Sequence, residues 1–324
     1  MNSLQSFQRL SKIAILAFIA GRCYADPILS VTFDDPKGLF TEYPEGISLR
    51  EFQTTPTIKE AEVATGLGGK GFLHIDTTEW VEGSAEPPPK SFELLSDEAM
   101  GTKAFLRLNN YKEVPGTRGF AVIRPDTPET SLGSLSQINN GKVTINGGLD
   151  VFFRYSEENP SQQELVPNLL ATGGEGLRLT VEADGGSVVA VLSDDKNETL
   201  FDTDQDGSAD ANRAKTEFVK AAPIESEVPY HLAITLETSD AGVVTMKVFL
   251  KQGTGAINTK QDEDLVSQGS FSVITDNADK VLYDGAISIG ANSRTSPTRA
   301  ILDLAAFRIF QPAPAVFPDV SGKE

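Results

Sequence analysis

The residues in this sequence that are best suited to chemistry are four aspartates in one short segment. Asp202, Asp204, Asp206 and Asp210 stand in the run DTDQDGSAD, and Gly207 follows the third of them. Aspartates at alternate positions can turn their carboxylates toward one centre, and glycine permits the sharp turn that this requires. Carboxylate oxygens at this spacing suit Ca²⁺, so we expect these four aspartates to bind a structural Ca²⁺ ion.

This segment departs from the most complete calcium-binding pattern at one position. The twelfth residue of such a loop is usually a glutamate that binds the ion through both carboxylate oxygens, and here that position holds Arg213. The segment nevertheless resembles the DxDxDGxxD calcium loops of thrombospondin type 3 and dockerin modules. The alternative interpretation is a solvated acidic turn between strands near Phe201 and Phe218.

Signals for a catalytic centre are sparse in the rest of the sequence. His74 and His231 both lie in runs of alternating apolar residues, so we interpret them as strand residues rather than as bases. The sequence has no G-x-S-x-G nucleophile motif and no E-x-D-x-x-E pattern that would pair two acids on one strand face for glycoside cleavage. Glu182 and Asp184 have suitable spacing, but Asp184 belongs to an expected turn. These observations favour a protein that is not an enzyme.

Aromatic side chains near loops are the remaining candidates, because binding sites for small ligands and sugars use aromatic faces. Trp80 and Tyr111 lie beside expected loops and are the predicted ligand-binding residues. Other aromatic residues occupy alternate positions of apolar strands and are expected in the core, namely Phe152, Phe153, Phe249, Phe307 and Phe310.

The N-terminal residues have the pattern of a secretory signal peptide. Arg9 and Lys12 precede the apolar run 13–21, and the small residues Cys23 and Ala25 follow at the positions expected before a cleavage site. The apolar run is too short to cross a hydrocarbon core of about 30 Å at about 1.5 Å per residue. We therefore predict a signal peptide at residues 1–25 and a mature chain without a transmembrane anchor, in a secreted, periplasmic or cell-surface location.

Composition limits the possible partners. The chain carries a formal net charge of −18, and binding to nucleic acid requires clustered Lys and Arg residues that displace counterions. We therefore expect no nucleic-acid partner. Cleavage after Ala25 would remove Cys23, the single cysteine, so the mature fold is expected to hold together by packing without disulfides.

The elements that must position these residues are predicted to be strands. Apolar residues alternate with period two in short runs that end at Gly, Asn, Asp or Pro. Asp184-Gly185-Gly186 and the run 238–242 are hairpin signals, because glycine adopts positive φ without steric cost. The expected strands are 29–33, 71–76, 104–108, 119–123, 149–155, 176–183, 187–193, 231–237, 243–251, 269–274, 285–290 and 300–310.

Four of these segments resemble one family in their order and spacing across roughly residues 148–310. PYHLAITL at 229–236 is similar to the "W-H-H-V-A-L-T-Y" strand of laminin G-like modules, and VVTMKVFL at 243–250 is similar to its hairpin partner. ISIGAN at 287–292 resembles "L-x-I-G-x-N", and the run 300–310 resembles the closing "G-x-I-D-D-V-R-I-Y-N" strand. The departures are Tyr230 in place of Trp, Leu232 in place of the second His, and Leu304 in place of the second Asp.

The chain is thus identified as resembling the laminin G-like, concanavalin A-like lectin-glucanase jelly-roll family. The resemblance implies an antiparallel two-sheet jelly-roll sandwich in which the first strand, within 30–35, pairs with the last. Residues 26–312 are expected to form this single domain. Residues 313–324 are expected to be a flexible tail, because the segment after Phe310 has three prolines and no apolar stretch.

Three functions are compatible with these expectations. The favoured one is a secreted, non-catalytic binding or adhesion module for glycan or extracellular protein ligands, with Ca²⁺ stabilising one loop. The enzyme alternative is a polysaccharide-active glycoside hydrolase or lyase of the same fold. The third is a structural coat component, which would bind copies of itself and no small ligand.

Overall fold

The fold is described from a computed structural model. It describes residues 26–32, 61–63, 71–75, 92–108, 121–125, 128–157, 170–172, 175–184, 187–275, 277, 279–282, 287–289 and 300–321. The predicted signal peptide at residues 1–25, together with Trp80 and Tyr111, lies outside these ranges. Within these ranges no helix has the length and apolar character to cross a membrane.

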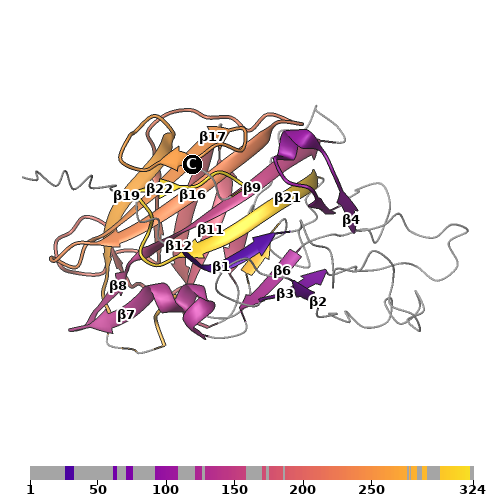
Figure 1. The fold of residues 1–324 in the computed structure, drawn as a ribbon. Coiled ribbons are helices and arrows are strands. Elements are labelled where there is room, and N and C mark those ends of the chain that lie inside the picture. Colours follow the sequence, from indigo (N-terminus) through magenta and orange to yellow (C-terminus); the bar gives the residue numbers. More distant parts are fainter. Residues whose placement is uncertain are drawn as a thin grey trace, which may run out of the picture.

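The larger of two main sheets is antiparallel and has ten strands. Its long strands lie side by side in Figure 1, with β16, β9 and β21 at the centre. β1 pairs with β21 and β15 pairs with β19, outside the main strand order. That main order is β13 (Phe201–Asp202), β19 (Leu265–Val273), β17 (Val244–Gln252), β16 (Pro229–Thr238), β9 (Gly147–Glu157), β21 (Ala300–Phe310), β5 (Phe105–Leu108) and β4 (Phe92–Leu95), with β1 at Pro27–Thr32 and β15 at Glu217–Phe218.

The second main sheet has eight antiparallel strands. Its order is β14 (Arg213–Lys215), β12 (Ser187–Asp194), β11 (Leu177–Asp184), β10 (Leu170–Thr172), β20 (Ile287–Ile289), β6 (Ala121–Pro125), β3 (Gly71–Ile75) and β2 (Ala61–Val63). Two small hairpin sheets pair β7 (Ser136–Asn139) with β8 (Lys142–Ile145) and β18 (Ile257–Asn258) with β22 (Val316–Phe317). The helices of the described residues are three short 3-10 turns, Glu98–Met100, Pro128–Thr130 and Leu132–Leu135.

The predicted all-β, antiparallel two-sheet class is therefore confirmed. Each strand expected from the alternating pattern has a counterpart in the structure, and both expected hairpins form. β11 and β12 are joined by two residues between Asp184 and Ser187, as the Asp-Gly-Gly signal indicated. β1 pairs with β21, so the first strand lies beside the last long one.

The main core lies between the two sheets. Along β9, Leu149, Val151 and Phe153 belong to the large interior cluster, which also includes Val181 of β11 and Leu192 of β12. Successive strand residues point to opposite faces, so residues at alternate positions of both sheets fill the space between them. The two layers thus form a sandwich with one shared core.

The outer face of the ten-stranded sheet is covered by further chain. Phe152 and Phe105 pack in one cluster with Met100 and Val320, and Phe249 and Phe310 pack in another with Ile257 and Phe317. Figure 1 shows β22 in front of the large sheet, near β16 and β19. This cover gives the domain a third layer made of loop segments and two short strands.

The third layer corrects the expectation of a flexible tail for residues 313–321. Val316 and Phe317 pair with Asn258 and Ile257 in a two-stranded sheet, and Phe317 is fully buried. Phe317 also contacts Phe310 edge to face, with ring centroids 5.2 Å apart. The segment therefore folds back over the sheet, where Phe317 and Val320 are buried.

One edge of the sandwich is closed by hydroxyl groups that connect the two sheets. Thr216 lies between β14 and β15 and is 1% exposed. Its Oγ1 accepts from the amide of Ala190 at 3.0 Å and lies 2.9 Å from Oγ of Ser267, which in turn donates to the carbonyl of Val188. β12 of the eight-stranded sheet is thereby joined to β19 of the ten-stranded sheet. Thr216 follows the Asp-rich segment in the sequence.

Candidate functional site

The Asp-rich segment forms a compact loop whose two ends are held together. The amides of Asp210 and Ala211 donate to the carbonyl of Phe201 at 2.8 and 2.9 Å, and the amides of Leu200 and Phe201 donate to the carbonyl of Ala211. Phe201 is fully buried and meets Phe271 edge to face. The loop 202–210 is thus anchored to the core at its base while most of its side chains face solvent.

Three of the four predicted aspartates come together in this loop. One carboxylate oxygen from each of Asp202, Asp204 and Asp206 lies within 4.8 Å of the others. Asp202 is 2% exposed, whereas Asp204 and Asp206 are exposed. A buried carboxylate thus lies beside two solvent-facing ones, so the cluster has a fixed inner side and an open outer side.

Backbone amides hold the three carboxylates in place. Asp202 accepts from the amides of Asp206 and Gly207 at 3.1 and 3.0 Å, Asp204 accepts from Asp206, and Asp206 accepts from Ser208. Gly207 has a φ of +95°, a conformation that residues with a Cβ adopt rarely. The glycine therefore permits the turn that places the two amides on Asp202, as expected from the sequence.

The fourth predicted ligand, Asp210, has a different role in the structure. Its carboxylate accepts from the amide and the hydroxyl of Thr203 at 3.0–3.1 Å. Arg213, at the position where a glutamate would complete a calcium loop, lies on β14 and pairs with Glu182 at 3.4 Å. The structure thus assembles three carboxylates, and Asp210 instead closes the loop by binding its other arm.

The aromatic candidates are resolved only in part. Trp80 and Tyr111 lie outside the described residues, so their prediction stays a prediction. Two other tyrosines, Tyr155 and Tyr230, are 2% and 4% exposed, and the hydroxyl of Tyr230 accepts from the amide of Glu225 at 2.9 Å, so neither presents a ring face to a ligand. The five phenylalanines expected in the core are all buried, and that prediction is confirmed.

His231 lies in a buried polar site rather than in an open one. Its Nδ1 lies 2.7 Å from the carbonyl oxygen of Gly255, and its Nε2 lies 3.0 Å from Oδ2 of Asp150. The ring stacks on Phe152, with ring centroids 3.9 Å apart. Neither His231 nor Asp150 is exposed to solvent. The pair therefore holds the third layer on the sheet. The interpretation of His231 as a packed strand residue is confirmed. His74 lies in β3, in register with Val122.

Arg308 completes this buried site. Its guanidinium donates to both oxygens of Asp150 and to the carbonyls of Asp319 and Pro318. Burial of Asp150 by itself raises the pKa of its carboxyl, but the charge of Arg308 and the hydrogen bonds from His231 and Arg308 outweigh burial, so the pKa lies below its ordinary value. The arrangement places an ion pair between Asp150 and Arg308 under the C-terminal segment.

A second ionic site on the same face was missed by sequence reasoning. Arg154 donates to Asp303 at 2.7 and 2.9 Å and also contacts Asp97, while Arg107 forms a two-point pair with Asp303 at 2.7 and 2.9 Å. Asp303 is fully buried. In the sequence, Arg154 and Asp303 stand at outward positions of two predicted strands. The register of the strands was needed to show that the two residues pair.

A third ionic site, also missed, fixes the turn after β12. Lys280 is 1% exposed and contacts Asp194, with Asp195 at 3.3 Å and Glu198 at 3.4 Å. Burial by itself lowers the pKa of Lys280, but its hydrogen bonds to the acids raise the pKa above its ordinary value. Three carboxylates here surround one ammonium group.

Comparison with known proteins gives distant structural similarities alone. No protein-family profile and no curated protein matches the sequence. Among solved structures, the chain is similar to the binding domain of botulinum neurotoxin serotype D, at 9% identity and a TM-score of 0.41 over 88% of this chain and 47% of that one. The chain thus spans about half the length of that neurotoxin domain.

Two further similarities are to proteins that carry carbohydrate-related names. The carbohydrate recognition domain of Emp47p is 10% identical with a TM-score of 0.30, over 70% of this chain and 91% of that one. The endo-β-1,4-glucuronan lyase from the fungus Trichoderma reesei is 8% identical with a TM-score of 0.35, over 71% of this chain and 92% of that one. At these values the similarities assign no ligand and no reaction to this chain.

Proposed function

We propose that this protein is an exported, non-catalytic binding or adhesion module with a concanavalin A-like sandwich, and that one Ca²⁺ ion stabilises its loop at 202–210. Glycans or extracellular proteins are its ligands. Export is supported by the signal-peptide pattern at residues 1–25. The concanavalin A-like type is supported by the ordered resemblance across residues 148–310 and by the pairing of β1 with β21.

The geometry of the loop is the main support for Ca²⁺. Three carboxylate groups within 4.8 Å of one another repel each other, and a divalent cation among them relieves this repulsion. Each carboxylate that accepts a backbone amide keeps further lone pairs for a metal. Ca²⁺ takes six to eight oxygens, so water and main-chain carbonyls would supply the ligands that the three aspartates do not.

The arrangement of His231 supports binding rather than catalysis. A general base must reach the proton that it abstracts, either directly or through one water. Both ring nitrogens of His231 are engaged by Gly255 and Asp150, and the side chain is fully buried. The residue therefore serves structure, and it is not available to a substrate on the surface.

Calorimetric titration with CaCl₂ and thermal unfolding in Ca²⁺ or in chelator test the metal site. We expect one ion bound per chain and a higher melting temperature with Ca²⁺, because a ligand that binds the folded state stabilises it by mass action. The double variant Asp204→Asn/Asp206→Asn should lose both effects. Asp240→Asn, an exposed aspartate in the turn between β16 and β17, is the matched control and should keep them. Identical melting curves for the wild type with and without Ca²⁺ would remove the metal from the proposal.

A panel of polysaccharides separates binding from catalysis. A binding module retains its ligand in affinity electrophoresis and releases no new reducing ends or unsaturated products during long incubation. Product release would instead establish the glycosidase or lyase alternative. Growth of large assemblies in light scattering, without retention by any glycan or protein, would establish the structural coat alternative.

A further inference from the structure

The turn that follows β12 carries a three-residue pattern that the proposed function does not use. Asn197-Glu198-Thr199 is the single occurrence in this sequence of Asn, any residue except proline, and then Ser or Thr. Asn159-Pro160-Ser161 does not qualify, because proline occupies its middle position. In an exported chain this pattern is the acceptor for N-linked oligosaccharides and belongs in a surface loop. The pattern therefore requires residues 197–199 to lie at the surface.

The structure places this pattern in an exposed segment between two buried residues. Asp194 before the segment is 2% exposed and Leu200 after it is 8% exposed. Residues 196–199 are all exposed. An attached oligosaccharide is bulky and hydrated, so its acceptor needs solvent around it. Four consecutive exposed residues provide that space.

The turn holds this segment outward through its main chain. The carboxylate of Asp194 accepts from the amides of Lys196 and Glu198 at 2.8 and 3.0 Å. The amide of Asn197 donates to the carbonyl of Asp194 at 3.2 Å, and the buried Lys280 contacts the carboxylate of Asp194 from the inner side. Because these bonds use backbone amides and Lys280, the turn does not depend on the side chain of Asn197.

The two side chains that the pattern requires are both available. Asn197 has a φ of +57°, a conformation that Asn adopts more readily than most residues, so the turn accounts for Asn at this position. The turn does not account for Thr199. Among the residues that the structure describes, neither side chain has a hydrogen-bond partner. The amide nitrogen of Asn197 and the hydroxyl of Thr199 are thus both open to solvent.

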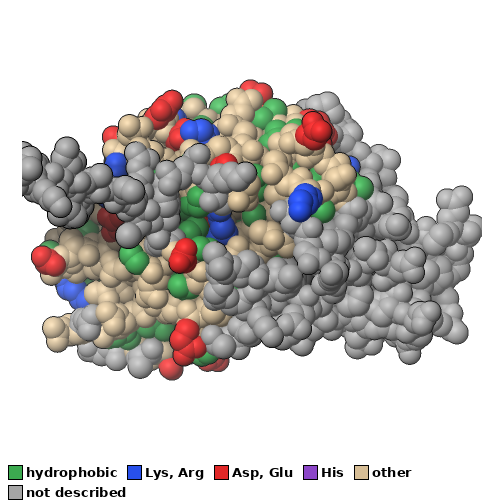
Figure 2. Space-filling model, viewed as in Figure 1, with side chains coloured by type: hydrophobic (Ala, Val, Ile, Leu, Met, Phe, Trp, Pro, Cys, Tyr) green, Lys and Arg blue, Asp and Glu red, His purple; other side chains and the backbone are tan. Residues whose placement is uncertain are grey.

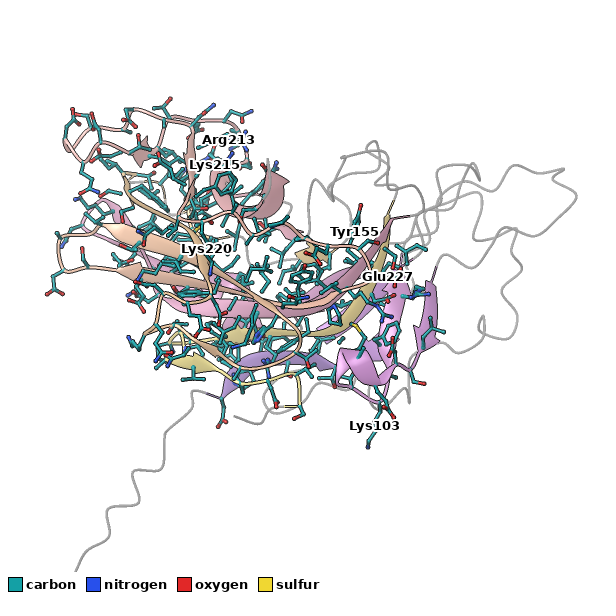
Figure 3. All side chains as sticks on the ribbon, turned by 90° about the horizontal axis from the view of Figure 1, so that it is seen from above. Lys103, Tyr155, Arg213, Lys215, Lys220 and Glu227 are labelled. Carbon is teal, nitrogen blue, oxygen red and sulfur yellow. The ribbon has the colours of Figure 1, made fainter. Side chains whose placement is uncertain are left out.

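The turn lies on a part of the surface that the third layer does not occupy. Ser193, directly before Asp194, pairs with Arg213 of β14, and Figure 3 shows Arg213 on the opposite side of the molecule from Lys103. Lys103 follows the short 3-10 turn whose Met100 packs with the third layer. Acidic side chains are scattered over the described part of the surface in Figure 2, as expected for a net charge of −18. An acidic residue in the middle of the pattern is therefore ordinary for this surface.

From these observations we infer that the side-chain amide of Asn197 carries an N-linked oligosaccharide, which a lipid-linked oligosaccharyl pyrophosphate supplies during export. Nδ2 of Asn197 forms a bond to the first carbon of the oligosaccharide, the bond from that carbon to the pyrophosphate oxygen breaks, and the lipid pyrophosphate leaves. Nδ2 gives up one proton, so the product is a neutral N-glycosyl amide and the transfer needs no oxidant or reductant. This inference rests on the export that the proposed function includes, and it goes beyond the proposed binding of ligands.

The first test uses the chain isolated from the culture medium of its natural source. Peptide N-glycosidase converts a modified Asn to Asp, and trypsin then releases the peptide 197–213, which follows Lys196 and ends at Arg213. We expect Asp at position 197 after the glycosidase and not without it. Asn212 in the same peptide should stay Asn, which controls for spontaneous deamidation. An unmodified Asn197 in the secreted chain would overturn the inference, while the proposed export would stand.

Variants secreted from a host that attaches N-linked oligosaccharides test whether the pattern itself is read. Asn197→Asp and Thr199→Ala should lose the oligosaccharide completely, and Asp also tolerates positive φ. Thr199→Ser and Glu198→Gln should keep it, because Ser satisfies the pattern and the middle position accepts any residue except proline. Retention of the oligosaccharide in Thr199→Ala would overturn the inference. Melting temperatures measured in parallel show that each variant remains folded.

One further variant separates a failure at Asn197 from a failure of export. Ser239→Asn/Ala241→Thr creates the same pattern in the exposed turn between β16 and β17. A secreted chain that is modified at position 239 and not at Asn197 would overturn the inference and leave export intact. Chains that stay inside the cells without an oligosaccharide at either position would overturn the proposed export, and the inference with it.

Discussion

Nε2 of His231 lies 3.0 Å from Oδ2 of Asp150, and both side chains are fully shielded from solvent. On the other side of the ring, Nδ1 lies 2.7 Å from the carbonyl oxygen of Gly255. Both ring nitrogens are therefore engaged by oxygen atoms of other residues. Because Gly255 belongs to the third layer and Asp150 to β9, the ring connects that layer to the sheet.

The first prediction concerns this connection. Replacing His231 with Leu leaves the buried Asp150 with one hydrogen-bond partner fewer, and the loss of a hydrogen bond to a buried charged group costs about 1.5 to 3 kcal/mol. We expect the free energy of unfolding, measured in urea, to fall by about this amount. Lys251→Met is the control, since Lys251 is paired with His231 in register but is 36% exposed, and its loss should cost about 1 kcal/mol or less. An unchanged stability in His231→Leu would contradict a structural role.

The second prediction is a loss of stability in acid. Asp150 and Asp194 both have a pKa below the ordinary value. Burial by itself raises the pKa of each carboxyl, but Arg308 and His231 outweigh burial at Asp150. At Asp194, Lys280 and the hydrogen bonds from backbone amides outweigh it. A lowered pKa in the folded state means that unfolding takes up protons near pH 4. The stabilisation is therefore complete above about pH 4 to 5 and is lost as the pH falls through the lowered values.

Calorimetric unfolding at several pH values checks this sign. The melting temperature should be level between pH 5 and 7 and should fall steeply below about pH 4. Proton uptake, measured at pH 4 in buffers of different ionisation enthalpy, gives the same information without any variant. Proton release on unfolding at that pH would contradict the lowered pKa values.

The sequence was sufficient to predict the long strands, because their apolar residues alternate with period two. Long strands such as β9 and β16 have apolar residues at every second position, and the Asp-Gly-Gly turn specifies its hairpin without reference to the rest of the chain. Strands of two or three residues, such as β14, β15 and β22, are too short to have a period. Their positions depend on partners that are distant in sequence.

The outer face of the large sheet shows why part of the site chemistry could not be predicted. Asp150 and Arg308 occupy outward strand positions, where a charge is ordinarily solvated. The structure buries them because residues 311–321 fold back over the sheet, and Arg308 binds two carbonyls of that segment. Likewise, the spacing at 202–210 predicted that four aspartates would turn toward one centre. Asp210 instead accepts hydrogen bonds from Thr203, apart from the other three.

The third prediction concerns Lys280 and the turn after β12. Lys280→Met removes the ammonium group from Asp194 and Asp195 and leaves buried carboxylates without their counter-charge. We expect a loss of about 3 kcal/mol in the free energy of unfolding. Lys196→Met, at an exposed position in the same turn, should change stability by less than about 0.5 kcal/mol. Equal effects of the two substitutions would show that the buried ionic site contributes nothing specific.

The last prediction uses the contact between Phe317 and Gly148 to test the third layer. Phe317→Ala removes a fully buried ring and should cost about 3 to 5 kcal/mol, whereas Val316→Ala, on the half-buried neighbour, should cost clearly less.

A Cβ at Gly148 would lie 2.8 Å from Cζ of Phe317 and 2.9 Å from the carbonyl oxygen of Ile234. Gly148→Ala should therefore destabilise the wild type, and it should cost less when Phe317 is already Ala, because one of its two clashes is gone. Some cost should remain from the rigid carbonyl of Ile234. Unfolding in urea of both single variants and the double variant measures this coupling, and strict additivity would mean that Phe317 does not pack on β9 in solution.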